Sequence, residues 1–112
     1  MSLRYMESFG TIIRNLRVQQ RLLVREVAAK LEIDPSLLSR IERGEKRMTR
    51  DQIGRLSRIL GIGEDALLIH YLSDRVVYEL RNEKLALRAM EVAEQKIAYQ
   101  QRSRRSRSKS SS

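Results

Sequence analysis

Apolar residues recur at spacings of three and four along nearly the whole chain, with polar residues between them. This spacing gathers apolar side chains on one face of an α-helix, whereas a half-buried strand would alternate with a period of two. We therefore predict an all-α chain. The expected helices span about Met6 to Gln20, Val24 to Leu31, Pro35 to Gly44, Thr49 to Gly61, the residue after Gly63 to Arg81, and Glu83 to Gln100.

Residues at the expected helix ends support these boundaries. Asp34 can cap the free amides of the third helix, and Pro35 suits its first turn because proline has no N–H to leave unpaired. Gly44 can take the left-handed conformation that ends a helix. Thr49 and Gln52 have the spacing of a capping box. The third and fourth helices therefore have defined starts.

The chain of 112 residues has room for one compact core and an extension. We expect the core in residues 6–68 and a helical extension in residues 69–100. Residues 101–112 are a Ser/Arg run that cannot bury enough apolar area to fold alone. We predict that this run is a disordered basic tail.

The charge is strongly basic and unevenly spread. The chain has 23 basic and 14 acidic side chains, a net charge of +9. Residues 1–63 and 102–112 are basic, whereas residues 64–101 are slightly acidic. This balance favours a polyanionic partner, either nucleic acid or an anionic membrane. Aromatic residues make up only 4% of the chain, too few for a platform that stacks single-stranded bases, so double-stranded DNA fits better.

The composition argues against several other classes of protein. There is no cysteine, and His70 is the single histidine, so we predict no disulfide, no metal site and no cofactor. The pairs Glu64 with Asp65 and Glu91 with Glu94 are interpreted as solvated surface carboxylates, and no enzymatic activity is expected. No apolar run approaches the roughly 18–20 residues of a membrane span, and no signal peptide is visible. We expect a cytoplasmic protein without a membrane partner.

Residues 24–44, VREVAAKLEIDPSLLSRIERG, predict two short helices joined by a tight turn. Ala28 is small enough to let the two helices approach closely, and Ile33 in the turn can fill the core between them. Such a pair holds one helix rigidly while its exposed side enters a DNA major groove.

The chain resembles the lambda-repressor/Cro family of helix-turn-helix proteins, often called XRE, over Phe9 to Leu68. The features that carry the resemblance are Arg17, EVAAKL at 26–31, Ile33, SLLSRIERG at 36–44 and the stretch from Leu56 to Leu60. It implies a lambda-repressor-like bundle of four to five helices in a bacterial transcription regulator. The third helix would be the recognition helix.

The resemblance assigns base reading to the exposed start of the third helix. Ser36, Leu37 and Arg40 fall on its base-reading positions, and Pro35 sets the angle at which the helix begins. Arg40 is the strongest candidate, since a guanidinium can bond to both O6 and N7 of guanine. The side chain of Leu37 can pack on a thymine methyl group.

Phosphate contacts are expected mainly from the basic run after the recognition helix. Each phosphate neutralised adds roughly one unit to the salt slope, which is the steepness with which the logarithm of the binding constant falls with the logarithm of the salt concentration. The candidates are Arg25, Ser39, Arg43, Lys46, Arg47 and Arg50. The family also implies an ion pair between Arg17 and Glu42 that ties the first helix to the third. The chain departs from the family in having Leu23-Val24 at the start of the second helix and Glu32 where glycine is usual.

In the last helix, Ala86, Met90, Ala93 and Ile97 recur at spacings of four, three and four. This stripe is either tertiary core or a dimer seam, and we favour the seam because the first four helices already fill a core. A two-fold dimer would place its recognition helices about 34 Å apart on a pseudo-palindrome. We expect a repressor or autoregulator, with a restriction–modification controller, an antitoxin or a protein-interaction module that binds polyanions non-specifically as alternatives.

Overall fold

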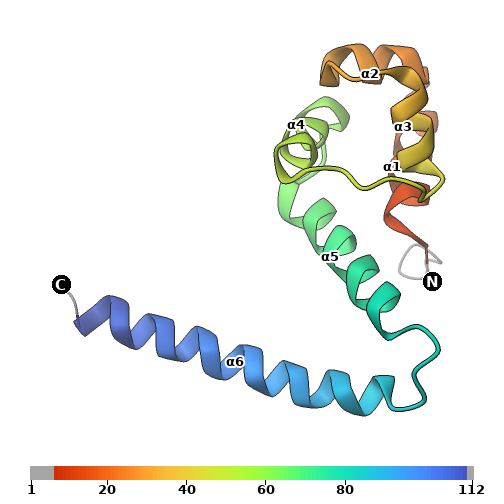
Figure 1. Cartoon of the computed structure of the whole chain (residues 1–112). Coiled ribbons are helices and arrows are strands. Elements are labelled where there is room, and N and C mark those ends of the chain that lie inside the picture. The colour runs from red at the N-terminus through yellow and green to blue at the C-terminus, as the bar shows by residue number, and fades with distance from the viewer. Residues whose placement is uncertain (1–6, 111–112) are drawn as a thin grey trace. The chain divides into compact units, whose positions relative to one another are not determined.

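The computed structural model of the chain describes residues 7–110, with side chains up to residue 107. In this range it contains six α-helices and no strand, which confirms the all-α prediction (Figure 1). Within residues 7–110, no helix combines the length and the apolar character that a membrane span requires. The helices are α1 (Phe9–Gln19), α2 (Val24–Leu31), α3 (Pro35–Glu42), α4 (Arg50–Leu60), α5 (Glu64–Leu80) and α6 (Ala86–Ser110).

The chain divides into two compact units, the first ending at Val76 and the second beginning at Val77. The first unit extends beyond residue 68, where the sequence placed the end of the DNA-binding domain. Leu68 and Tyr71 of α5 pack against the core, and Asp74 accepts a hydrogen bond from the backbone N of Phe9 at 2.8 Å. The first part of α5 is therefore part of this unit.

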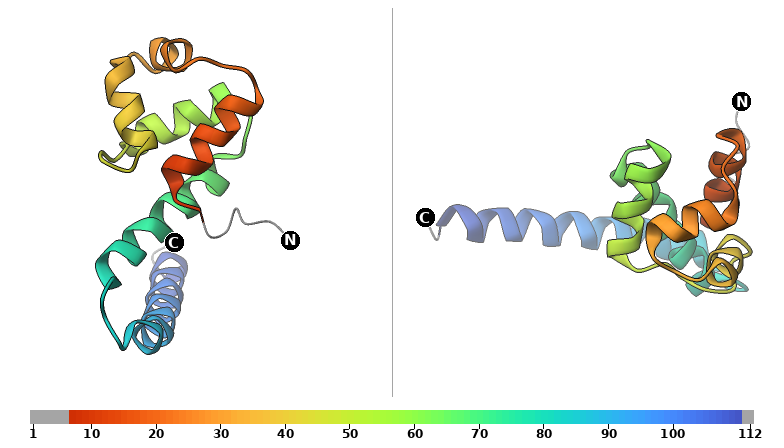
Figure 2. Two further views of the ribbon diagram at one scale, coloured as in Figure 1. Left: turned by 90° about the vertical axis from the view of Figure 1, so that its right-hand side faces the viewer. Right: turned by 90° about the horizontal axis from the view of Figure 1, so that it is seen from above.

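The first unit is built around one apolar core. α1 packs against α3, and α2 packs against both α3 and α4 (Figure 2). Ala28 of α2 is completely buried, and Ile33 in the following turn packs against the core. The other members of the core are Phe9, Ile13, Val27, Leu31, Leu38, Ile41, Met48, Ile53, Leu56, Leu60 and Leu67.

α1 begins at Phe9, later than the predicted start at Met6, which lies outside the described residues. Ser8 has extended backbone angles, and its hydroxyl accepts a hydrogen bond from the backbone N of Thr11 at 3.2 Å. Such a serine cap satisfies an amide that the helix itself leaves without a partner. The ring of Phe9 also meets Tyr71 edge to face, with the centroids 5.6 Å apart.

α6 corrects the prediction for the end of the chain. The helix continues to Ser110, whereas the sequence predicted a helix ending near Gln100 and a disordered tail after it. Arginine and lysine are good helix formers, and cations are favourable near a helix C-terminus because they oppose the helix dipole. The low-complexity interpretation weighed burial alone and overlooked these local preferences.

Candidate nucleic-acid interface

The helix pair α2–α3 is joined by a short turn with a left-handed residue. Glu32 has φ 59° and ψ 42°, a left-handed conformation that glycine adopts readily. The backbone N of Ile33 donates to the carbonyl of Ala28 at 3.0 Å, which closes the turn. α2 has no capping side chain at Leu23, but Glu26 accepts from the Leu23 backbone N at 2.8 Å. Leu23 and Glu32 are therefore compatible with two helices joined by a tight turn.

The first turn of α3 is held by Asp34. Its carboxylate accepts from the backbone N of Ser36 at 3.1 Å and from the Ser36 hydroxyl at 3.0 Å. The hydroxyl proton of Ser36 is thus engaged within the protein, and its exposed oxygen can still accept a hydrogen bond. Pro35 occupies the first position of α3, where its lack of an N–H leaves no donor unpaired.

The two other candidates for base reading differ in exposure. Leu37 is half-buried and packs against the core, so only part of it can reach a base. The Arg40 side chain is 47% exposed and is long enough to extend beyond the helix surface. Arg40 is therefore more available than Leu37 for contact outside the domain.

Glu45 lies beside the arginines at the end of α3, and the sequence interpretation missed it. Arg43 Nε donates to Glu45 Oε2 at 2.7 Å, and Arg40 Nε lies 3.8 Å from Glu45 Oε1. The hydrogen bond from Arg43 lowers the pKa of the Glu45 carboxyl and raises the pKa of Arg43. The available signal was an acidic residue inside an otherwise basic run. A DNA phosphate that approaches Arg43 must compete with this carboxylate.

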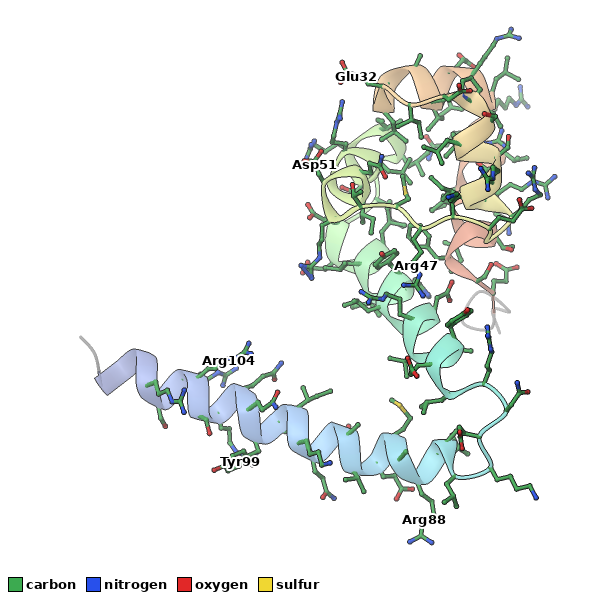
Figure 3. All side chains as sticks on the ribbon, viewed as in Figure 1. Glu32, Arg47, Asp51, Arg88, Tyr99 and Arg104 are labelled. Atoms are coloured by element: carbon green, nitrogen blue, oxygen red, sulfur yellow. The ribbon has the colours of Figure 1, made fainter. Side chains whose placement is uncertain are left out.

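Residues 46–50, the end of the connection from α3 to α4 and the first residue of α4, carry three exposed cations around one buried side chain. Met48 is 2% exposed and belongs to the core, although both of its neighbours are exposed. Lys46, Arg47 and Arg50 are exposed, and Figure 3 shows Arg47 on this connection. Thr49 accepts from the backbone N of Gln52 at 3.1 Å, and Gln52 accepts from the backbone N of Thr49 at 2.9 Å. The predicted capping box therefore fixes the end of this segment.

Two of the predicted phosphate contacts share a concave surface. Ser39 and Arg43 line an open hollow of about 760 Å³, together with Thr11 and Arg14 of α1. The other candidates, Arg25, Lys46, Arg47 and Arg50, are exposed but do not line this hollow. The cations are thus distributed over α2, the connection from α3 to α4 and the start of α4.

Arg17 and Glu42 form a two-point ion pair between α1 and α3. Arg17 Nε donates to Glu42 Oε2 at 2.8 Å, and Nη2 donates to Oε1 at 3.0 Å. Nη1 donates to the carbonyl of Leu22 at 2.8 Å, and the two charged side chains are only 11% and 6% exposed. The hydrogen bond from Arg17 to Glu42 raises the pKa of the guanidinium. This pair holds the end of α3 in place rather than offering charge to a ligand.

Gly10 sets the closeness of α1 and α3, and the sequence interpretation did not single it out. A Cβ at this position would lie 2.6 Å from the carbonyl oxygen of Ile41 and closer still to that of Glu42. Only glycine permits this backbone contact, because real Cβ atoms do not approach backbone atoms so closely. The orientation of α3 therefore depends on a residue that carries no side chain.

The predicted dimer stripe lies on α6, in the second unit. Ala86 and Ala93 are half-buried, whereas Met90 and Ile97 are 38% and 53% exposed. No side chain from residue 86 to residue 107 is buried. Within the second unit these residues are not part of a closed core.

Comparison with known proteins agrees with the geometry of the first unit. A family model described as "Helix-turn-helix domain" matches residues 8–68, just over half of the chain. No curated protein sequence matches the chain. The chain is similar to a crystal structure of the clp gene regulator ClgR from Corynebacterium glutamicum, with 26% identity and a TM-score of 0.51 over 59% of this chain and 86% of that one. A second ClgR crystal structure has 22% identity and a TM-score of 0.53 over 81% of this chain and 83% of that one, which shows a shared fold.

Proposed function

This chain belongs to the helix-turn-helix domain family of DNA-binding transcription regulators, and on that premise we propose that it binds a pseudo-palindromic operator as a homodimer. The observation that carries the proposal is the rigid presentation of α3. Its start is capped by Asp34, its end is held by Arg17, and Arg40 remains exposed between them. A helix fixed in this way can place a side chain in the major groove reproducibly.

In the proposed complex, α3 lies in the major groove and Arg40 reads guanine through its O6 and N7 atoms. Ser36 accepts a hydrogen bond from a base amino group, and the exposed part of Leu37 contacts a thymine methyl group. The phosphate contacts come from Arg25, Ser39, Arg43, Lys46, Arg47 and Arg50. These contacts fix the position of the domain on the duplex and carry little sequence information.

The apolar face of α6 in the second unit and the two-fold symmetry of the proposed target support the proposed dimer. An exposed apolar stripe on α6 suits association with a second copy, and two domains one helical turn of DNA apart match successive major grooves. Binding over a promoter blocks transcription from it. We propose that the protein represses its own promoter, as an autoregulator of the lambda-repressor/Cro type.

Footprinting on the DNA upstream of its own gene tests this function. The intact chain should protect a two-fold site, and Arg40→Ala should weaken binding by about 5- to 150-fold, the loss expected for one bidentate contact to guanine worth about 1–3 kcal/mol. Arg58→Ala, an exposed arginine in the last turn of α4, is the matched control and should bind as the unmodified chain does. A lack of protection at low salt, or equal affinity of the Arg40 and Arg58 variants, would overturn the proposal.

A further inference from the structure

The apolar stripe of α6 has an order of sizes that the proposed dimer alone does not explain. Ala86, Met90, Ala93 and Ile97 fall within a sector of about 60° around the helix axis, since successive residues turn by about 100°. Along this face a small residue alternates with a large one. The large members, Met90 and Ile97, are the exposed ones.

In a two-fold symmetric pair, the alternation is complementary to itself only when the stripe is reversed. In an antiparallel pair, Ala86 faces Ile97 of the second copy and Met90 faces Ala93 of the second copy. Every contact then joins a large side chain to a small one, which fills space at the density of a protein interior. In a parallel pair in register, alanine faces alanine and methionine faces methionine, leaving gaps beside crowded positions.

The charge on the end of α6 favours the same direction. Residues 102–112 contain five basic side chains and no acidic one. Arg104 lies seven residues after Ile97 and continues the stripe, on the opposite side of α6 from Arg88 and Tyr99 (Figure 3). A parallel pair would bring Arg104 against Arg104 of the second copy, and like charges at such short range repel. An antiparallel pair separates the two basic ends.

We propose that two copies of the chain associate through antiparallel α6 helices, with Ala86, Met90, Ala93 and Ile97 as the seam. This deepens the proposed function, because it names the surface and the direction of the dimer. The two basic helix ends then project from opposite ends of the seam. A second copy fits this face because the side-chain sizes of α6 complement those of α6 itself in the reversed direction, and because this direction keeps the two basic helix ends apart.

Disulfide trapping tests the direction, since the chain has no cysteine of its own. Full-length Ala86→Cys and Ile97→Cys variants, one carrying a size tag, are mixed, oxidised and separated without reductant. The expected main product is the disulfide between the two different variants. Each variant alone should remain uncrosslinked, because its thiols lie about 16 Å apart along an antiparallel pair and a disulfide needs Cα atoms about 4.4–6.8 Å apart.

Arg88→Cys is the control, because Arg88 lies on the side of α6 opposite Arg104 (Figure 3). Mixed with Ile97→Cys, it should give no disulfide. Crosslinking of Ala86→Cys with itself would overturn the proposal in favour of a parallel pair. If no mixture crosslinks while the intact chain still protects a two-fold site, the seam is wrong and the proposed function stands. If the two-fold site is not protected, the proposed function fails whatever the disulfides show.

Discussion

Replacement of Arg17 by methionine should destabilise the first unit strongly. The change removes two hydrogen bonds to Glu42 and one to the carbonyl of Leu22. The Glu42 side chain is only 6% exposed, so its carboxylate would be left buried without a counter-charge. Breaking one side of such a pair costs about 3–5 kcal/mol, a large share of the roughly 5–15 kcal/mol that separates most folded domains from their unfolded state.

The assay is urea unfolding of the full-length chain followed by helical circular dichroism, with the free energy extrapolated to water. The matched variant is Arg17→Met combined with Glu42→Met, which replaces both charges by apolar side chains of similar length. This double variant should recover most of the loss, because an apolar pair in place of a buried ion pair is often neutral or stabilising. A loss below about 1 kcal/mol for the single variant, or a double variant as unstable as the sum of both single changes, would refute the reasoning.

Three further substitutions test other features of the first unit. Gly10→Ala should lower the free energy of unfolding by about 1–3 kcal/mol, because the new Cβ would overlap two backbone carbonyls of α3. The control Gly63→Ala meets open space and should not lower it. Equal urea midpoints for the two variants would contradict this. The free energy of unfolding of Glu32→Gly should exceed that of Glu32→Ala by about 1 kcal/mol, since only glycine relieves the left-handed strain. A lower urea midpoint for the glycine variant would count against it. Glu45→Gln should bind duplex DNA more tightly and add about one unit to the salt slope, unlike Asp65→Asn. The difference in DNA affinity between Glu45→Gln and Asp65→Asn should persist from pH 8 down to pH 5, because Arg43 holds the pKa of Glu45 below its ordinary value and keeps the carboxylate charged. Identical DNA-binding curves for the two variants would refute it.

The helices of the first unit were predictable because their ends are marked by local chemistry. The capping box at Thr49, the proline after Asp34 and the left-handed glycine at position 61 each act through residues only a few positions away. The prediction was less accurate where two local tendencies compete. In residues 101–110 the lack of apolar side chains suggested disorder, whereas the helix preference of arginine prevails in the structure.

The contacts that position α3 depend on residues far apart in the sequence, and pattern alone does not reveal most of them. Asp74 reaches the start of α1 from α5, and Gly10 is required only because α3 approaches it. The partners Arg17 and Glu42 were expected from family resemblance and not from their spacing. Glu45 lay in view within a basic run, but its effect on Arg43 needs the folded geometry. Which bases Arg40 and Ser36 contact stays a prediction.

Met48 bears on how tightly the protein can hold DNA. Its side chain anchors the short connection that carries Lys46 and Arg47, and the capping box at Thr49 holds the far end. A connection that is ordered before binding loses little conformational entropy when its cations meet phosphate. Substitutions at Met48 would therefore resemble the loss of a phosphate contact, although this side chain is buried and has no charge to offer.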